Sequence, residues 1–403
     1  MKVLLVGSGG REHALAWKLS QSPDLDELHA APGNPGIAEL GRCHPVRAED
    51  GEGLLGLAGS LDADLVVVGP EAPLVAGVAD ELRHSGIAVF GPSAAAARIE
   101  GSKSFAKDVM REAGVPIPQT LSIARPPCVI KADGLAGGKG VFVCHDQPEL
   151  DTALRAATAF GDTIVIEELL EGEEISVFAL CDGSQALALP SVQDFKRAED
   201  GDAGPNTGGM GSYSPVPGFG TVETEELLDL VHRPVLDELA VRGAPFVGVL
   251  FAGLMVTDDG PHVLEFNCRF GDPETQSLLA RLDGDLLRPL AAAAAGDLSS
   301  AELTVSEGAA VTVVLAAGDY PATGDVGSPI TGIEAAEETG AHVFHAGTAR
   351  NGEQVVTNGG RILNVTATGD TVTDARERAY AACERISFDG MRYRRDIAAV
   401  AHV

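Results

Sequence analysis

The feature that most constrains the fold is a series of short apolar runs that alternate with helical stretches at the start of the chain. Residues 2–6 (KVLLV), 64–68 (DLVVV) and 87–91 (IAVFG) are almost continuously apolar, and residues 73–84 have helical periodicity. Apolar strands that alternate with helices are typical of a parallel sheet covered on both faces. The sequence therefore predicts an α/β fold with a Rossmann-like N-terminal domain, whose ligands bind at the carboxyl ends of the strands.

A glycine-rich loop (GSGGRE) follows the first of these strands. Glu12 stands where the dinucleotide-binding fingerprint has its third glycine, which disfavours an NAD site. Such a loop at the start of a helix can still bind an anion through its backbone N–H groups. We therefore expect a sugar phosphate to bind here, through Gly9, Gly10 and Arg11. Glu71, at the end of a later strand, is a candidate for binding a hydroxyl or an amine.

The stretch VLEFNCRFGDPETQ combines a strand with polar residues at a spacing of two. Alternate residues of a strand share a face, so Glu265, Asn267 and Arg269 are expected to lie together. A carboxylate beside an amide oxygen suits Mg²⁺ shared with substrate phosphates, and an arginine adds positive charge where a phosphoryl group is transferred. The turn that follows predicts a helix start, with Asp272 as the N-cap and Pro273 as the first helical residue.

A glycine-rich hairpin, CVIKADGLAGGKGVFVC, precedes this stretch and contains lysine, which is scarce in this chain. The chain has seven lysines and 22 arginines, and two of the lysines lie in this hairpin. Two apolar strands that flank a loop of glycines and a lysine suit a flap that closes over a polyphosphate, although the spacing differs from a P-loop. The expected phosphate contacts are Lys103, Lys131, Gly137, Gly138 and Lys139.

The segment TIVIEELLEGEEISVFAL predicts a strand, an apolar connector and a second strand. Such a connector can pack on an adenine while its backbone reads the edge of the ring. Glu167 would flank the base, and Glu174 is placed to meet a ribose hydroxyl. The candidate nucleotide contacts are Glu167, Glu168, Leu170 and Glu174.

The segment SVQDFKRAEDGDAGPNTGGMGSYSP is expected to be irregular, because it is long, polar and rich in glycine. Loops of this length are often functional. Its candidate substrate contacts are a compact polar cluster of Asp194, Lys196 and Arg197, and the glycines Gly208 and Gly209, where backbone can approach a ligand closely. The tight turn VVTNGGR near the C-terminus can also touch a ligand.

Composition excludes several classes of function. A net charge of −30 disfavours a nucleic-acid partner, because phosphate backbones need a basic face. No apolar run approaches the roughly 20 residues of a membrane span, and the N-terminus resembles a first strand rather than a signal peptide. The six cysteines are scattered without zinc spacing. We therefore expect a cytoplasmic protein with no membrane partner.

Together these motifs resemble the glycinamide ribonucleotide synthetase (phosphoribosylamine–glycine ligase) family of ATP-grasp enzymes, over essentially the whole chain. The resemblance implies a pre-ATP-grasp domain at residues 1–102, an ATP-grasp core at 103–304 with a flap lobe at about 121–169, and an α+β C-terminal domain at 305–403. The motifs are GSGGREHALAW, APGNPG, VGPEAPL, GSKSFAKD, VIKADGLAGGKGV, QDFKR, GPNTGGMGSYSP, EFNCRFGDPETQ and VFHAGT.

The resemblance also implies roles for individual residues. Lys103 and Lys131 would contact ATP phosphates, and residues 167–170 and Glu174 would hold adenine and ribose. Glu265 and Asn267 would bind Mg²⁺ (or Mn²⁺), and Arg269, with Lys131, would stabilise the charge of the transferred phosphoryl group. Gly253 stands where many ATP-grasp enzymes have a further acidic ligand, and the flap is shorter than usual. Substrate contacts would include Asp194, Lys196, Arg197, Gly208, Gly209, Asp272 and Pro273.

The reaction implied is the ATP-dependent ligation of glycine to 5-phosphoribosylamine through glycyl phosphate, in de novo purine biosynthesis. We expect a monomer with no further enzyme domain after the C-terminal one, and we identify no general base. One alternative is an ATP-grasp ligase for a different acid or amine. A more remote alternative is a Rossmann-type NAD oxidoreductase.

Overall fold

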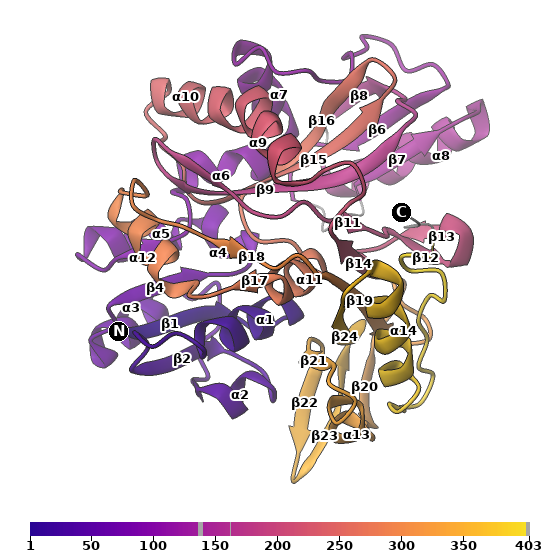
Figure 1. The fold of residues 1–403 in the computed structure, drawn as a ribbon. Coiled ribbons are helices and arrows are strands. Elements are labelled where there is room, and N and C mark those ends of the chain that lie inside the picture. The colour runs from indigo at the N-terminus through magenta and orange to yellow at the C-terminus, as the bar shows by residue number, and fades with distance from the viewer. Residues whose placement is uncertain (136–139, 162, 400–403) are drawn as a thin grey trace.

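The computed structural model describes residues 1–135, 140–161 and 163–399, and it begins with a parallel sheet (Figure 1). Leu4 and Val6 in the first strand face one apolar core, while Val3 and Leu5 face another. Both faces of the sheet are therefore covered, and the predicted α/β class is confirmed. The strand order is β3 (Arg42–Cys43), β2 (Glu27–Pro32), β1 (Lys2–Gly7), β4 (Leu65–Val68) and β5 (Val89–Phe90).

Helices alternate with these strands along the chain. The helix predicted over residues 73–84 is divided in two, because Gly77 adopts a left-handed conformation (φ 92°) that ends one helix before the next begins. The helices are α1 (Gly10–Leu19), α2 (Ile37–Leu40), α3 (Gly51–Leu61), α4 (Glu71–Ala76), α5 (Val78–His84) and α6 (Ala94–Gly101).

An antiparallel sheet carries the predicted magnesium-type motif. Gly253 lies directly opposite Glu265 in two long neighbouring strands, of which the one with Glu265 forms an edge of the sheet. On one face, a helical run packs its buried residues, among them Val231 and Leu236, into the core shared with the sheet. The strands are β10 (Ala186–Ala188), β9 (Glu173–Asp182), β15 (Val247–Thr257) and β16 (Gly260–Asn267), and the helices are α7 (Lys103–Glu112), α9 (Thr221–Leu227) and α10 (Arg233–Val241), with a π-helical turn at Leu228–His232.

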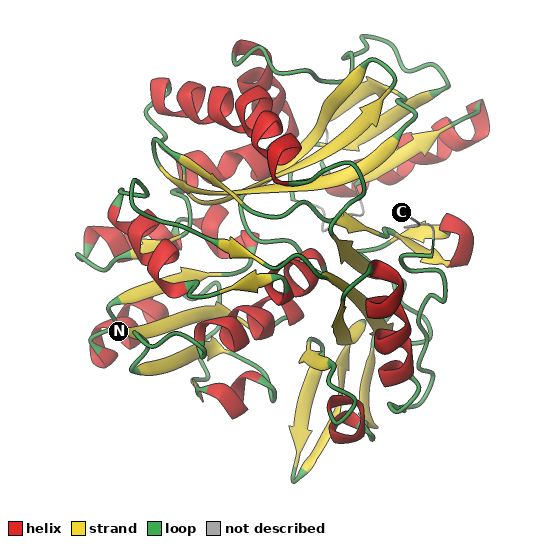
Figure 2. Cartoon of the chain, viewed as in Figure 1, coloured by secondary structure: helices red, strands yellow, loops and turns green. Residues whose placement is uncertain are grey.

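A smaller lobe lies beside this sheet and has its own apolar core, which includes Ile130 and Leu150 (Figure 2). The predicted hairpin is present, with Cys128 opposite Cys144. The predicted contacts Gly137, Gly138 and Lys139 lie outside the described residues. The lobe contains β7 (Val141–Cys144), β6 (Cys128–Ala132), β8 (Ile164–Glu168), α8 (Gln147–Ala157) and a 3₁₀ turn at Thr158–Phe160.

The prediction that residues 191–215 are irregular is wrong. This segment forms four strands, and two of them extend the C-terminal sheet. Tyr213 reaches the apolar core of that sheet, while Ser212 and Ser214 hydrogen-bond on its other side, so the segment alternates as a strand does. The sheet order is β11 (Gln193–Asp194), β14 (Gly211–Ser214), β19 (Ala309–Ala316), β24 (Arg361–Gly369) and β21 (His342–His345), and β12 (Arg197–Glu199) pairs with β13 (Ala203–Asn206).

The helix after the magnesium-type motif lies where the N-terminal helix α1 meets the C-terminal sheet (Figure 1). It begins at Glu274, with Pro273 in the N-cap position, so the predicted cap at Asp272 is wrong. The Asp272 carboxylate instead accepts a hydrogen bond from Gln276 Nε2 at 2.9 Å and pairs with Arg361 at 3.4 Å. These partners hold the carboxylate away from the end of the helix.

The remaining elements complete the C-terminal half of the chain. None of the helices in the described part of the chain is long and apolar enough to span a membrane. The remaining elements are α11 (Glu274–Ala280), α12 (Leu287–Ala295), α13 (Ile333–Glu337), α14 (Val372–Cys383), β17 (Leu282–Asp283), β18 (Thr304–Val305), β20 (Asp325–Pro329), β22 (Thr348–Asn351), β23 (Gln354–Gly359) and a 3₁₀ turn at Asp200–Asp202.

Candidate active site

The end of β16 brings together three of the predicted residues with a lysine from α7. Lys103 Nζ lies 2.8 Å from Glu265 Oε2, and Arg269 Nη2 donates to Asn267 Oδ1 at 3.2 Å. Lys103 is the main reason why the pKa of Glu265 falls to about 2. A carboxylate and an amide oxygen fit Mg²⁺ or Mn²⁺, because such ions take only one or two protein ligands when substrate phosphates supply the others.

A buried glutamate holds two lysines beside this strand. Glu167 Oε2 lies 2.9 Å from Lys131 Nζ, and Glu167 Oε1 lies 2.6 Å from Lys107 Nζ. Lys131 also donates to the backbone oxygen of Leu264 at 2.7 Å, which ties it to β16. Burial lowers the pKa of Lys107 although Glu167 opposes the change. The carboxylate predicted to flank a base is therefore committed to two ammonium groups.

Lys107 is a residue that the sequence analysis missed. It lies four residues after Lys103 on α7, so the two lysines share a helix face. Its signal was available, since the chain has only seven lysines. A second lysine one helical turn after Lys103 was therefore open to prediction as a site residue.

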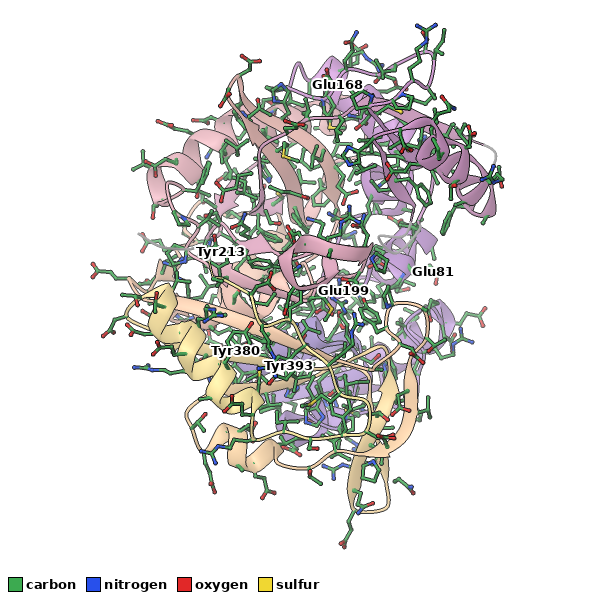
Figure 3. All side chains as sticks on the ribbon, turned by 90° about the vertical axis from the view of Figure 1, so that its right-hand side faces the viewer. Glu81, Glu168, Glu199, Tyr213, Tyr380 and Tyr393 are labelled. Carbon is green, nitrogen blue, oxygen red and sulfur yellow. The ribbon has the colours of Figure 1, made fainter. Side chains whose placement is uncertain are left out.

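The predicted nucleotide and substrate residues of β8 to β12 separate into two groups, one in the smaller lobe and one around Lys196. Glu168 lies in the smaller lobe, where it accepts a hydrogen bond from the backbone of Gln119 at 2.7 Å, and half-buried Leu170 follows it (Figure 3). Lys196 Nζ lies 2.5 Å from Glu174 Oε1 and 2.9 Å from Asp194 Oδ1. Burial raises the pKa of Glu174 although Lys196 opposes the change.

The predicted cluster of Asp194, Lys196 and Arg197 is only partly correct. Arg197 donates to the backbone oxygen of Gly204 at 2.9 Å, across the β12–β13 hairpin. Neighbouring residues of an extended chain point in opposite directions, so Arg197 turns away when Lys196 faces Glu174.

Arg269 is fixed by carboxylates from the N-terminal half of the chain. Its Nη2 lies 3.0 Å from Glu100 Oε1, and its Nε lies 3.3 Å from Glu71 Oε2. Burial favours the neutral form of Glu71, but Arg269 and Arg11 outweigh it and lower the pKa of Glu71 to about 2. Glu71, predicted to bind a hydroxyl or amine, therefore orients an arginine. Glu100, which the sequence analysis missed, also accepts from the backbone N–H of Cys268 at 2.8 Å.

A cavity of about 500 Å³ lies at the carboxyl ends of β1 and β2, where the N-terminal domain meets the C-terminal sheet. This is the edge of the parallel sheet at which ligands were expected. Four glycine-containing segments line the cavity, and Arg361 supplies a positive charge. The lining residues are Ser8, Gly9, Pro32, Gly33, Asn34, Asp272, Ala346, Gly347, Thr348, Asn358, Gly359, Gly360 and Arg361.

Gly9 is the one residue of the predicted trio Gly9, Gly10 and Arg11 among the described residues that line this cavity. Gly10 packs tightly, since a methyl group there would lie 2.0 Å from Asn364 Nδ2. Arg11 is buried, 2.6 Å from Glu12 Oε1, and donates to the backbone oxygen of Phe270 at 3.0 Å. The expected cation therefore comes from Arg361 in the VVTNGGR turn.

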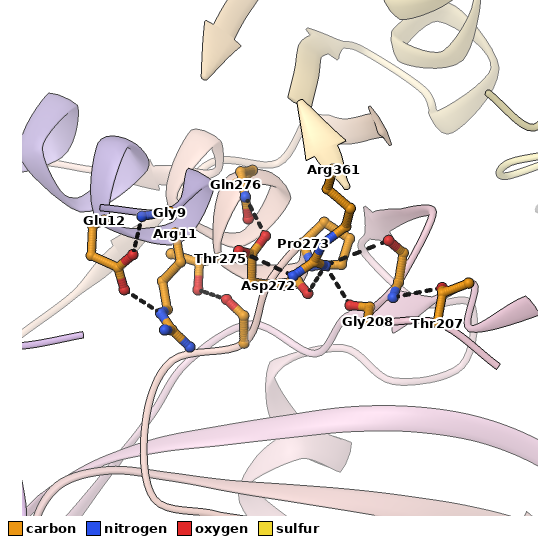
Figure 4. A network of polar contacts seen from close by, with 12 residues as sticks. Gly9, Arg11, Glu12, Thr207, Gly208, Asp272, Pro273, Thr275, Gln276 and Arg361 are labelled. Atoms are coloured by element: carbon orange, nitrogen blue, oxygen red, sulfur yellow. Dashed lines mark hydrogen bonds and ion pairs between the residues drawn. The ribbon is translucent and has the colours of Figure 1, made fainter. Parts of the chain in front are cut away.

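Arg361 also connects three segments around Asp272 (Figure 4). Its Nη1 donates to the backbone oxygens of Asp272, at 2.5 Å, and of Gly208. Gly209, with φ 106°, lies so close to Pro273 that a methyl group would be 2.3 Å from Pro273 Cδ. In this structure Gly208 lies against Arg361 and Gly209 against Pro273, and the predicted contact of these glycines with a ligand stays a prediction.

Comparisons with known proteins agree over the whole chain. Family models of phosphoribosylglycinamide synthetase match at residues 1–100 (N domain), 101–275 (ATP-grasp domain) and 310–400 (C domain). The phosphoribosylamine–glycine ligase of Streptomyces coelicolor is 53% identical, with 100% of this chain and 99% of that protein aligned. That of Mesorhizobium japonicum is 50% identical over 98% of this chain and 97% of that protein.

Solved structures give the same result. The phosphoribosylamine–glycine ligase of Thermotoga maritima has a TM-score of 0.83 at 35% identity, with 99% of this chain and 100% of that chain covered. The biotin carboxylase domain of Hydrogenobacter thermophilus 2-oxoglutarate carboxylase shares the fold, with a TM-score of 0.70 at 18% identity over 97% of this chain and 91% of that chain. The chain therefore belongs to the phosphoribosylglycinamide synthetase family.

Proposed function

We propose that the chain joins glycine to 5-phosphoribosylamine at the expense of ATP, as a phosphoribosylamine–glycine ligase of purine biosynthesis. One observation carries this proposal beyond family membership. The segment from Glu265 to Asp272 connects a cluster of oxygen ligands and lysines to a glycine-lined cavity with an arginine. A ligase that uses a nucleotide to join an amino acid to a sugar phosphate needs two such sites side by side.

The first step activates the carboxylate of glycine, which is a poor electrophile. Transfer of the γ-phosphoryl group gives glycyl phosphate, and catalysis of such transfers consists mainly of positioning and charge stabilisation. Lys131 and Arg269 provide positive charge at fixed positions, because Glu167 holds one and Glu71 and Glu100 hold the other. Glu265 and Asn267 would hold Mg²⁺ or Mn²⁺, which when bound would supply positive charge beside the phosphates.

The second step joins the two substrates. The phosphate of phosphoribosylamine binds in the cavity beside Gly9 and Arg361, which the geometry of the glycine turns supports. The amine attacks the acyl carbon, and inorganic phosphate leaves. Glycyl phosphate is exposed to hydrolysis unless water is kept out, which is the role we assign to the lobe that carries Lys131.

Other assignments stay predictions. They are adenine binding by residues 167–170, ribose binding by Glu174, phosphate contacts of Gly137, Gly138 and Lys139, the domain limits 1–102, 103–304 and 305–403, a monomeric state and a cytoplasmic location.

A substrate-dependence assay tests the proposal. ADP release is measured with ATP, Mg²⁺ and phosphoribosylamine formed in situ from ribose 5-phosphate and ammonia. We expect release to need both glycine and the sugar amine, and to fall when alanine or serine replaces glycine. Turnover with another acid or amine, at a higher kcat/KM than with these substrates, would favour the alternative ATP-grasp ligase.

A further inference from the structure

Glu274, the first residue of α11, is a buried carboxylate that the proposed steps leave without a role. The residue is 5% exposed, and its Oε2 has no hydrogen-bond partner among the residues that the structure describes. Burying a carboxylate oxygen in this way is costly, so a stable fold that contains one needs an explanation. Its position suggests one, because it follows Arg269 of the first site and Asp272 of the cavity within one short segment.

Charged groups from several elements surround this carboxylate. Asp194 and Lys196 face it from β11 and the residues that follow, Arg269 faces it from the end of β16, and Arg361 faces it from β24. Burial and Asp194 raise the pKa of Glu274, and Lys196 and Arg269 lower it, with a result of about 7. A carboxyl group that titrates near neutral pH can both accept and release a proton under physiological conditions.

Gly271 leaves room for the free oxygen. A methyl group at this position would lie 2.5 Å from Glu274 Oε2 and 2.7 Å from its Cδ. The absence of a side chain at residue 271 therefore allows the carboxylate its present position. Replacing Gly271 by alanine would displace the carboxylate without changing its chemistry, which makes this residue useful in a test.

We infer that Glu274 accepts the proton that the amine of phosphoribosylamine loses when it attacks glycyl phosphate. The inference rests on the proposed function. In this step the amine nitrogen forms a bond to the acyl carbon, the bond from that carbon to the phosphate oxygen breaks, and phosphate leaves with the electron pair. The nitrogen proton passes to the Glu274 carboxylate and from there to the solvent as the product leaves.

A single-turnover experiment separates this step from phosphoryl transfer. Wild type and Glu274→Gln, each in excess over ATP, are mixed with saturating glycine and phosphoribosylamine, and ADP and glycinamide ribonucleotide are measured after quenching. We expect Glu274→Gln to form ADP at the wild-type rate but the ribonucleotide about 10²-fold more slowly. Glu384→Gln, an equal charge change at an exposed position on the C-terminal side of α14, is the control and should match wild type.

The pH dependence gives a second readout. A proton acceptor must be deprotonated, so wild-type kcat at saturating substrates should rise with pH to a plateau, with an apparent pKa near 7. This acid limb should disappear in Glu274→Gln, remain in Glu274→Asp, and shift in Gly271→Ala.

The outcomes distinguish this inference from the proposed function. If ADP release by the wild-type protein did not depend on both glycine and phosphoribosylamine, the proposed function itself would be refuted. An active wild type with equal loss of both steps in Glu274→Gln, or with an unchanged acid limb, would overturn the role of Glu274 alone. An acid limb kept by Glu274→Asp and lost by Glu274→Gln supports it.

Discussion

Replacing Arg269 tests how this enzyme stabilises the transferred phosphoryl group. The guanidinium contacts Glu100, Asn267 and Glu71 at 3.0, 3.2 and 3.3 Å. Its side chain is 17% exposed, so one edge remains open to a substrate. A lysine carries the same charge on a single nitrogen and cannot meet three fixed partners at once. Both Arg269→Lys and Arg269→Ala should therefore lose the charge at its working position.

The size of the effect follows from these contacts. Removing a positioned group that stabilises transition-state charge costs about 10²–10³-fold in kcat, or about 2.7–4 kcal/mol. Arg269→Ala also leaves Glu100 without this cation and Glu71 with Arg11 alone, at 4.0 Å, and breaking a buried ion pair costs about 3–5 kcal/mol of stability. Loss of folded protein could therefore imitate loss of catalysis.

A double variant separates the two effects. In Arg269→Ala with Glu100→Gln, the amide oxygen still accepts from the Cys268 backbone, but one unpaired carboxylate is gone. We expect urea unfolding to recover part of the lost stability, while kcat stays about 10²-fold or more below wild type. The KM for ATP should change little. A folded double variant with near-normal kcat would refute the role assigned to Arg269.

Three further predictions concern the cavity, the lysines and the buried histidines. Arg361→Ala should raise the KM for phosphoribosylamine at least about tenfold and leave ATP affinity, measured by calorimetry, unchanged; a change in ATP affinity alone would contradict the cavity assignment. Glu167→Gln should reduce the free energy of unfolding by about 3 kcal/mol, because Lys107 and Lys131 lose their carboxylate, and ATP should stabilise this variant more than wild type in thermal melts. Burial is the main reason why the pKa values of His13, His232 and His345 fall to about 3, 4 and 4. Only the unfolded chain takes up these protons near pH 6.5, so the free energy of unfolding should fall below that pH by up to about 1.4 kcal/mol per unit for each histidine. Urea titrations at pH 7, 6 and 5 check this, and a flat profile would contradict it.

The parts of the fold that sequence reasoning predicted are those with a strong local pattern. The apolar runs of β1 and β4 predict a parallel sheet because only strands covered on both faces lack polar positions. The alternation around Glu265 likewise predicts a strand with its polar residues on one face. Residues 191–215 were predicted wrongly, because β14 pairs with β19, about a hundred residues later, and the segment itself is rich in glycine.

In the candidate site too, contacts between segments that are distant in sequence were not predicted. Glu265, Asn267 and Arg269 come together because they follow one another at a spacing of two in one strand and its continuation, whereas Lys103 reaches Glu265 from α7. The ligand contacts of Arg11 and Glu71 stay predictions, and the sequence does not show that these residues pair with Glu12 and Arg269. Glu100 and Glu274 were missed because burial, which depends on distant segments, distinguishes them from the other charged residues.

The measurement that tests the central claim most directly follows oxygen from glycine. With glycine labelled with ¹⁸O in its carboxylate, activation by the γ-phosphoryl group transfers one carboxylate oxygen to phosphate when the amine displaces it. We predict that the inorganic phosphate released carries one ¹⁸O atom per turnover. Unlabelled phosphate, formed together with glycinamide ribonucleotide, would show that the carboxylate is never phosphorylated and would contradict the account.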